Sequence, residues 1–511
     1  MGGKIKRLVG IVLLSLYPCW LWGDEVLPTP LEGRDYQALP NSRQIGAFLQ
    51  RLADYSPKAE LLTYGRSAGD RPLMALLLSN DSQFLRQGES APGKLKVLLV
   101  GGQHGTEPSG SEALQSLARD IAWGSVPSVL EHLDLIVIPN SNPDGRDASR
   151  RVNAGGVNLS TDYVLLSQPE TQALVRLLDR FRPHVLLDVH ESAVLKKKSL
   201  GAQGYLTDFE AQFEFANHPN VAPELRLFAA HVFLPELLDT VNALGLPAQH
   251  YIGEITSIHQ PITHGGISLR NLRNYAGMQG VFSFLVENRL DPPGDWPSWR
   301  NIQVRVAKQR ICLLAFLEKL IEFRENLLRR IAHDLNHPNS TLVALRASYA
   351  PSPLQPKIKI SLRRLESGER VTREFAYHGQ IVAKEWVFRP KAYAITAHQR
   401  ELAQLLDRHN IDYRRITHTQ SARCRCQRIV KVKTRRWRQG VIVHQEVQVD
   451  MLEEVGQIRL KPGDLVIDFD QPKGSLAFLL LDPRSSTSMF HRPPYTAWLA
   501  EGKKHFGVPL W

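Results

Sequence analysis

One segment, KLKVLLVGGQHGTE, places a histidine and a glutamate three residues apart just after an apolar run. The run Leu95–Val100 predicts a buried strand, and the two glycines that follow predict a turn that presents His104 and Glu107. Imidazole and carboxylate are zinc ligands, and a catalytic zinc site takes about three protein ligands and leaves one position open. The pair therefore offers two candidate ligands. The alternative is that His104 closes a loop and Glu107 caps the next helix.

A third ligand and a catalytic acid are available further along the chain. His190 follows an apolar run in HVLLDVHES, and a ligand from a distant strand end completes a workable zinc geometry. Asp188 and Glu191 are candidates to orient the histidine rings as acceptors. Glu287, after VFSFLV, is a candidate to take a proton from water and return it to a leaving amine. The alternative is that Glu287 is a charge at the end of a strand.

The elements that must bring these residues together alternate between strands and helices. This alternation predicts an α/β fold with a mixed, mainly parallel sheet flanked by helices. Ligand sites in such sheets lie beyond the carboxyl ends of the strands, where His104, Asn140, His190 and Glu287 all fall. The apolar patterns predict helices at 41–55, 108–122, 170–181 and 304–331, and strands at 61–64, 73–78, 95–100, 133–139, 184–189 and 281–286.

With 511 residues, the chain is long enough for several domains. Residues 1–23 carry early positive charge and then a short apolar stretch, as in a signal peptide or an N-terminal anchor. We therefore expect a periplasmic or extracellular protein, membrane-anchored if this segment stays. A composition shift near residue 339 divides a catalytic domain (24–338) from a smaller C-terminal α+β domain (339–511) of unknown role. Three cysteines remain after signal removal, and an odd number argues against a disulfide framework.

The net charge of +12 is concentrated in part between Arg423 and Arg438. Alternating valine and lysine residues there predict a strand with one basic, exposed face. A solvated surface is one interpretation, and contact with an anionic polymer or membrane surface is the other. An export signal argues against nucleic acid as a partner.

Six motifs occur in a fixed order between residues 44 and 290: GRSAGDRPL, GGQHGTEPSG, PNSNPDG, RVNAGGVNL, DVHES and SFLVENR. This ordered set resembles the carboxypeptidase A-like zinc carboxypeptidase family. The resemblance implies one Zn²⁺ per chain, bound by His104, Glu107 and His190, and Glu287 as general base and acid. It also implies an arginine in RVNAGGVNL that stabilises the oxyanion. Arg151 is the best match, and the neighbouring arginine, at position 150, is the competitor.

The chain departs from the family pattern at one place. Where the family usually carries an Asn-Arg pair that grips the substrate's terminal carboxylate, this chain has Ser160 and Thr161. These side chains cannot make the bidentate bond of an arginine. Arg270 or Arg273 could supply the charge from another wall; the alternative is that both are surface residues. For the family's flexible tyrosine there is no secure counterpart, although His264 and Tyr275 lie near its expected place.

Three functions remain in view. The first is a zinc-dependent hydrolase of amide bonds, most simply a metallocarboxypeptidase-type peptidase acting on peptides. The second is a deacylase or amidase that acts on acylated amino acids or small amides and needs no terminal-carboxylate clamp. The third is a binding protein on the same fold, against which the complete set of candidate ligands argues.

Overall fold

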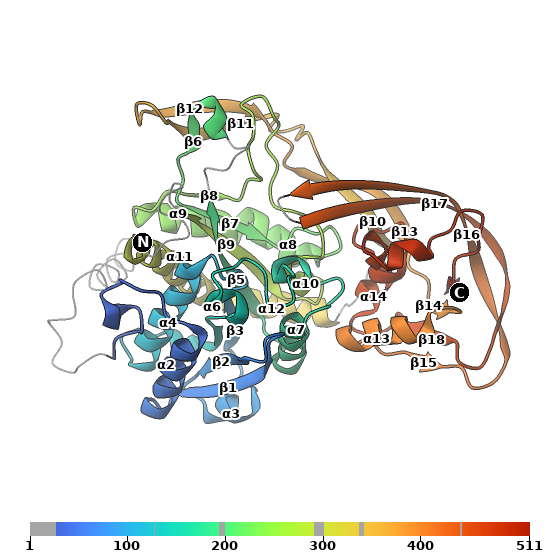
Figure 1. Cartoon of the computed structure of the whole chain (residues 1–511), viewed down its shortest axis with the longest axis horizontal. Helices are drawn as coiled ribbons and strands as arrows, with labels where there is room; N and C mark the ends of the chain where they lie inside the picture. The colour runs from blue at the N-terminus through green and yellow to red at the C-terminus, as the bar shows by residue number, and fades with distance from the viewer. Residues whose placement is uncertain (1–26, 127, 194–199, 291–300, 337–341, 440–441) are drawn as a thin grey trace.

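The computed structural model describes residues 27–126, 128–193, 200–290, 301–336, 342–439 and 442–511. The expected signal peptide or anchor, residues 1–23, lies outside them. An eight-stranded sheet forms the centre of the first part of the chain, with strand order β1-β2-β4-β3-β5-β9-β7-β8 (Figure 1). Its strands are β1 (Ala59–Arg66), β2 (Pro72–Leu78), β3 (Leu95–Gly101), β4 (Leu133–Ile138), β5 (Val185–Ala193), β7 (Ala211–Phe215), β8 (Ala248–His250) and β9 (Phe282–Leu290).

The four central strands β4, β3, β5 and β9 run parallel, which confirms the expected mixed, mainly parallel sheet. Both faces of this centre are covered, because alternate residues of β3 enter two different cores. Val97 and Leu99 pack in one core and Leu98 and Val100 in the other, and all four side chains are fully buried. A parallel sheet covered on both faces explains why β3 is a continuous apolar run and not an alternating one.

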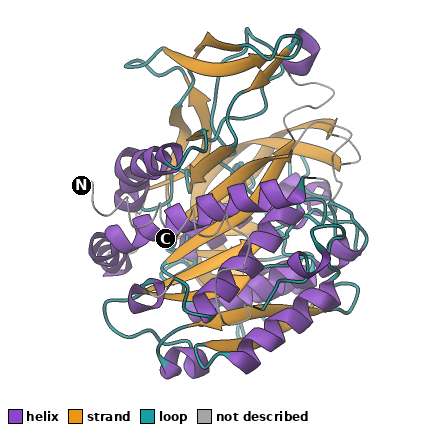
Figure 2. Ribbon diagram, turned by 90° about the vertical axis from the view of Figure 1, so that its left-hand side faces the viewer, coloured by secondary structure: helices purple, strands orange, loops and turns teal. Residues whose placement is uncertain are grey.

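Helices flank the sheet on both sides, as Figure 2 shows in side view. The first core takes residues from α2 (Ser42–Tyr55), α4 (Pro108–Ala122), α9 (Leu234–Ala243) and α11 (Ile302–Glu322). The second takes residues from α7 (Pro169–Phe181) and α10 (Leu272–Gly277). The helices predicted at 41–55, 108–122 and 170–181 are confirmed. The remaining helices of this part are the short α3 (Ser82–Gln87), α5 (Val129–His132), α6 (Pro143–Asp147) and α8 (Pro223–Phe228).

The single helix predicted at 304–331 is wrong. The chain forms two helices there, α11 and α12 (Arg324–Asn336), which meet at Phe323. The ψ angle of Phe323 is 8°, outside the helical range, although its N–H still bonds to Lys319 O. The Phe323 ring packs edge-on against Phe228, with ring centroids 5.5 Å apart. Apolar spacing alone continues across this break, so the sequence pattern could not reveal it.

The C-terminal part forms mostly antiparallel strands (Figure 1). A six-stranded sheet has the order β15-β18-β14-β19-β16-β17, and smaller sheets pair β10 with β13 and β12 with β11. The strands are β10 (Leu342–Ala350), β11 (Lys357–Arg364), β12 (Arg370–Ala376), β13 (Gln380–Phe388), β14 (Ala392–Ile395), β15 (Arg414–Arg415), β16 (Gln420–Gln439), β17 (Ile442–Leu460), β18 (Leu465–Asp468) and β19 (Gly507–Leu510), with helices α13 (Gln399–His409) and α14 (Gly474–Leu481).

The two parts of the chain share a core. The second core contains Leu98 and Leu186 of the main sheet together with Tyr393 and Leu480 of the C-terminal part. Strand β6 (Tyr205–Thr207), from the first part, also pairs antiparallel with β11. The C-terminal part therefore packs against one face of the main sheet and is held there by apolar burial.

The basic segment from Arg423 to Arg438 lies in β16, the first strand of a long hairpin (Figure 1). Its partner β17 places acidic residues opposite basic ones, with Lys431 in register with Asp450 and Arg435 with Glu446. Opposite charges across strands offset part of the positive potential of the segment. In the described part of the chain, no helix combines the length and apolarity needed to cross a bilayer.

Candidate metal centre and active site

The turn after β3 positions the first two candidate ligands. Gly102 adopts a φ of 70°, and a Cβ there would lie 3.0 Å from the Pro139 carbonyl oxygen. Gly105 is tighter still, because a Cβ would lie 2.0 Å from the backbone of Gly145. Only glycine fits such close approach of two backbones. The turn thus places His104 over the end of the sheet and Glu107 at the start of α4.

His104, Glu107 and His190 converge, each with a buried side chain. One ligand atom from each lies within 4.8 Å of the other two. Glu107 Oε1 lies 2.9 Å from His104 Nδ1, and Glu107 Oε2 lies 3.0 Å from His190 Nδ1. Glu107 makes no side-chain cap to α4 among the described residues. Its carboxylate faces both imidazoles instead, which argues against the alternative of a simple helix cap.

The outer nitrogen of each imidazole is anchored. Asn158 Oδ1 and Ser160 Oγ each lie 2.9 Å from His104 Nε2. Asp188 Oδ1 lies 2.9 Å from His190 Nε2. With Nε2 held in this way, both rings turn Nδ1 toward Glu107. An acceptor on the far nitrogen is the usual partner of a metal-binding histidine, because it fixes the tautomer and the ring orientation.

The three residues fit a zinc ion. His104 Nδ1 is buried, and among the described residues its near neighbour Glu107 Oε1, 2.9 Å away, does not meet it with good hydrogen-bond geometry, so a metal ion would satisfy this nitrogen better. Burial lowers the pKa of His104, which favours the neutral imidazole that binds metal. Burial acts to lower the pKa of His190, but Asp188 and Glu107 raise it well above its usual value. Two imidazole nitrogens and one carboxylate form a donor set suited to Zn²⁺ with an open position.

Glu287 lies beside this centre. It is half-buried on β9 and in register with His190 on the parallel neighbour β5. Register partners on adjacent strands project from the same face of the sheet, so the two side chains share that face. Arg151 also reaches the centre, with Nη1 2.6 Å from Glu107 Oε1. The guanidinium of Arg151 is half-exposed and borders the candidate ligands, while no contact of the Arg150 side chain with them is seen among the described residues.

The four candidate substrate-binding residues lie in different places. Ser160 contacts the ring of His104, and Thr161 donates its hydroxyl to Asn158 O. Thr161 and Arg270 line the same pocket. Arg273 is buried elsewhere, with Nη2 donating to Gly266 O at 2.8 Å. Arg270 therefore lines the pocket, whereas the side chain of Arg273 does not.

Several residues that support the centre were not singled out from the sequence, although Gln103 lies within the motif GGQHGTEPSG. Gln103 donates to Asp188 Oδ1 at 2.7 Å, and Tyr163 donates to Gln103 Oε1. Gln309, from α11, donates to the carbonyl of His190. Glu191 does not orient a histidine ring, as first considered: its carboxylate accepts from the buried guanidinium of Arg305 at 3.0 Å. Tertiary packing alone assembles these contacts, so sequence spacing gave no signal for them.

A second His/Glu cluster lies outside the main centre. Glu214 is fully buried and accepts from His250 Nε2 at 3.0 Å, and the ring of His264 stacks on His250 at 3.6 Å. Both nitrogens of His264 are already bonded, Nδ1 to Tyr251 O and Nε2 to the hydroxyl of Tyr377. Tyr377 belongs to the C-terminal part, so this cluster joins the two parts of the chain. Its saturated nitrogens make His264 a structural residue and leave it no lone pair for a metal.

Comparison with known proteins found similar sequences and similar structures. Residues 45–195 match the family model described as zinc carboxypeptidase. The chain is 25% identical over 407 residues to carboxypeptidase 2 of Trichophyton tonsurans, covering 77% of this chain and 73% of that protein. It is 24% identical over 457 residues to carboxypeptidase 2 of Trichophyton rubrum, covering 86% and 81%. A metallo-carboxypeptidase structure from Burkholderia cenocepacia is 18% identical, with a TM-score of 0.43, covering 56% of this chain and 71% of that one.

Proposed function

We propose that this chain is a zinc peptidase of the metallocarboxypeptidase type, supported by the match of residues 45–195 to the zinc carboxypeptidase family model and by its likeness to carboxypeptidase 2 proteins. His104, Glu107 and His190 hold the zinc ion. Glu287 serves as general base and then general acid, and Arg151 binds the carbonyl oxygen of the scissile bond. The convergence of His104 Nδ1 and His190 Nδ1 on the Glu107 carboxylate carries this proposal.

Zinc, when bound, supplies a Lewis acid that polarises a carbonyl oxygen and lowers the pKa of water. The Glu287 carboxylate accepts the proton that water loses as it attacks the carbonyl carbon, and then donates that proton to the leaving nitrogen. Arg151 donates hydrogen bonds to the oxygen on which negative charge develops. Asp188 and Asn158 keep the two imidazoles in the orientation that presents Nδ1.

A Glu287→Gln substitution tests the proton-transfer role. It preserves shape but removes the basic group, so we expect turnover of a peptide substrate to fall at least about 100-fold while zinc content is unchanged. Glu366→Gln is the matched control, because Glu366 is an exposed carboxylate of the C-terminal part. Normal hydrolysis by the Glu287→Gln protein would reject this assignment.

One observation favours a second candidate function, a deacylase or amidase. The side chain of Ser160 is turned to His104 and that of Thr161 to the backbone of Asn158, so neither brings a positive charge to a substrate carboxylate. An enzyme without such a charge would accept substrates that lack a terminal carboxylate. Comparing a peptide with its C-terminally amidated form separates the two: equal cleavage of both favours the amidase, and selective cleavage of the free acid favours the carboxypeptidase.

A further inference from the structure

A pocket of about 500 Å³ lies between the two parts of the chain. One wall is the segment from Val152 to Ser167, which follows Arg151, together with Ser268 and Arg270 before α10. The other wall comes from β17 and from the segment that includes Arg492. The volume is in the range of ligand-binding pockets. Neither part of the chain forms this pocket alone.

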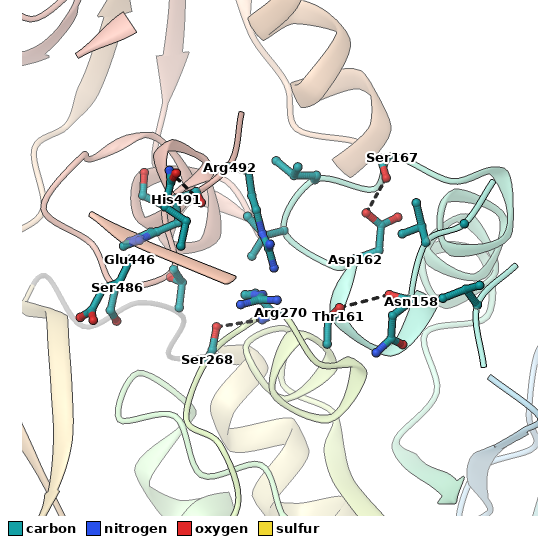
Figure 3. Close-up of a pocket in the computed structure, with 18 residues that line it drawn as sticks. Asn158, Thr161, Asp162, Ser167, Ser268, Arg270, Glu446, Ser486, His491 and Arg492 are labelled. Atoms are coloured by element: carbon teal, nitrogen blue, oxygen red, sulfur yellow. Dashed lines mark hydrogen bonds between the residues drawn. The ribbon is translucent and has the colours of Figure 1, made fainter. Parts of the chain in front are cut away.

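Two arginines, one from each wall, meet in the pocket. Figure 3 shows the guanidinium groups of Arg270 and Arg492 ending toward one another near its centre. The Nε atom of Arg270 is buried and has no hydrogen-bond partner among the described residues. Facing guanidinium groups repel each other electrostatically. An anion placed between them is attracted to both groups and so stabilises the arrangement. The planar fork of arginine matches a carboxylate particularly well, because two N–H groups can bond to its two oxygens.

The other ionisable groups of the pocket are Asp162, Glu446 and His491. Burial lowers the pKa of Arg492, and the charge of Asp162 acts in the opposite direction. Asp162 is occupied within its own wall, where its carboxylate accepts from the hydroxyls of Ser167 and Thr171. Burial also raises the pKa of Asp162. Glu446 lies on the opposite wall, in register with Arg435 of the neighbouring strand. His491 is neutral, because burial lowers its pKa and both of its nitrogens are bonded to backbone groups.

The pocket adjoins the metal centre through one residue. Asn158 lines the pocket, and its Oδ1 lies 2.9 Å from Nε2 of His104. Thr161, which stands where the family pattern has the arginine of its clamp, lines the same wall and faces the arginine pair (Figure 3). The positive charge that Thr161 lacks is thus available a short way across the pocket, from Arg270 and Arg492.

Polar contacts join the C-terminal part to the first part of the chain. The Tyr275 hydroxyl lies 3.0 Å from His409 Nδ1, and His409 Nε2 donates to Val164 O at 3.0 Å. Lys473 pairs with Asp179 of α7 at 2.6 Å. These polar contacts add to the apolar core that the two parts share. A rigid wall is what a specific binding pocket requires.

We propose that Arg270 and Arg492 form a carboxylate-binding subsite for the peptide substrate, completed by the C-terminal part of the chain. The subsite replaces the Asn-Arg clamp, and the C-terminal part thereby becomes a component of the active site. This inference rests on the proposed peptidase function. The carboxylate comes from one of two sources, the free C-terminus of the peptide or an acidic side chain near it.

Binding to the Glu287→Gln protein tests the subsite without turnover. The probes are four N-terminally labelled hexapeptides that end in leucine or glutamate, each as free acid and as amide, measured by fluorescence anisotropy. We expect Arg270→Gln and Arg492→Gln each to weaken binding of the leucine free acid about 10- to 100-fold, as for the loss of one charge-assisted hydrogen bond. The leucine amide should change less than twofold. Arg459→Gln, an exposed arginine of β17, is the matched control and should change neither.

The four peptides distinguish the two sources of the carboxylate. An effect that follows the free terminus in the leucine pair assigns the subsite to the terminal carboxylate. An effect confined to the two glutamate peptides assigns it to the side chain. If both variants leave all affinities unchanged, or weaken the leucine acid and the leucine amide equally, the subsite proposal is overturned.

Two further comparisons separate loss of binding from loss of folding. Arg492→Lys keeps the charge and should lose less affinity than Arg492→Gln, and thermal unfolding of each variant reports whether the junction survives. If Arg492→Gln does not fold, Arg270→Gln decides alone, because Arg270 is half-exposed and lies in the first part. Failure of the proposed function looks different: the wild-type protein would bind the peptides with the same arginine dependence yet cleave none of them.

Discussion

Ser160 Oγ lies 2.9 Å from His104 Nε2. The residue that stands in place of the clamp's asparagine is therefore a neighbour of a candidate zinc ligand. Asn158 Oδ1 shares the same contact and also accepts from the Ser160 hydroxyl. This small cluster ties the orientation of His104 to the segment that forms one wall of the two-arginine pocket.

Asn158→Ala should weaken zinc binding. The substitution removes the acceptor that holds His104 Nε2, and loss of such an outer partner typically costs about 10- to 100-fold in metal affinity. Competition with a zinc-binding dye gives the dissociation constant. Asn410→Ala, at the end of α13, serves as the control and should leave zinc affinity unchanged. Unaltered affinity in the Asn158→Ala protein would show that the ring is oriented by other contacts.

Gly105→Ala should lower kcat/KM about 100-fold although it adds only one methyl group. Its Cβ would lie 2.0 Å from the backbone of Gly145, so the turn that carries His104 must move. A displacement of about 1 Å at a catalytic site can cost about 100-fold in kcat/KM. Gly456→Ala is the matched control, because nothing lies within 4 Å of a Cβ there. A fully active Gly105→Ala protein would show that the turn can accommodate a side chain at this position.

Arg305→Met should destabilise the fold strongly. Arg305 and Glu191 form an ion pair at 3.0 Å with both side chains fully buried. Removing one partner leaves a buried charge, which typically costs about 3–5 kcal/mol. Urea unfolding measures the free-energy change, and Arg459→Met on the surface should stay within about 0.5 kcal/mol of wild type. A loss under about 1 kcal/mol would mean that other groups compensate Glu191.

Stability should fall steeply in acid because of Glu214. Burial acts to raise the pKa of Glu214, but the charge and hydrogen bond of His250 outweigh it and lower the pKa to about 2 from 4.5. A carboxyl with a lowered folded-state pKa stabilises the fold above pH 4.5, and this stabilisation is lost as pH falls toward 2. Its full size is about 3 kcal/mol.

The companion residue His264 adds to the acid dependence. Burial lowers its pKa to about 4 from 6.5, so unfolding takes up a proton and stability falls as pH drops below 6.5. Urea unfolding of wild type and Glu214→Gln at several pH values separates the two contributions. The Glu214→Gln protein should show a flatter decline between pH 4.5 and 2 and keep the decline between pH 6.5 and 4. An unchanged slope below pH 4.5 would assign the acid sensitivity to other carboxylates.

The sequence predicted most of the catalytic part of the fold. Buried strands such as β3 and amphipathic helices such as α4 carry strong apolar patterns, and their bounds agree closely with the structure. Short or exposed elements such as β8 and β15 carry no such pattern and were missed. The division at residue 339 did not reveal that both parts share a core, because which faces pack together depends on the whole fold.

For the site as well, the sequence predicted some residues and could not predict others. His104, Glu107 and His190 could be proposed from residue type and spacing, since each follows an apolar strand. Arg492 could not, because nothing in its sequence neighbourhood indicates a ligand, and only the docking of the C-terminal part brings it to Arg270.

Zinc content measured together with hydrolysis tests the central claim most directly. We compare the wild-type protein with His104→Ala and with His259→Ala, an exposed histidine far from the motifs in sequence. The account predicts about one zinc per chain and chelator-sensitive peptide hydrolysis in wild type and His259→Ala, and loss of both in His104→Ala. A His104→Ala protein that retains zinc and cleaves peptides at the wild-type rate would contradict it.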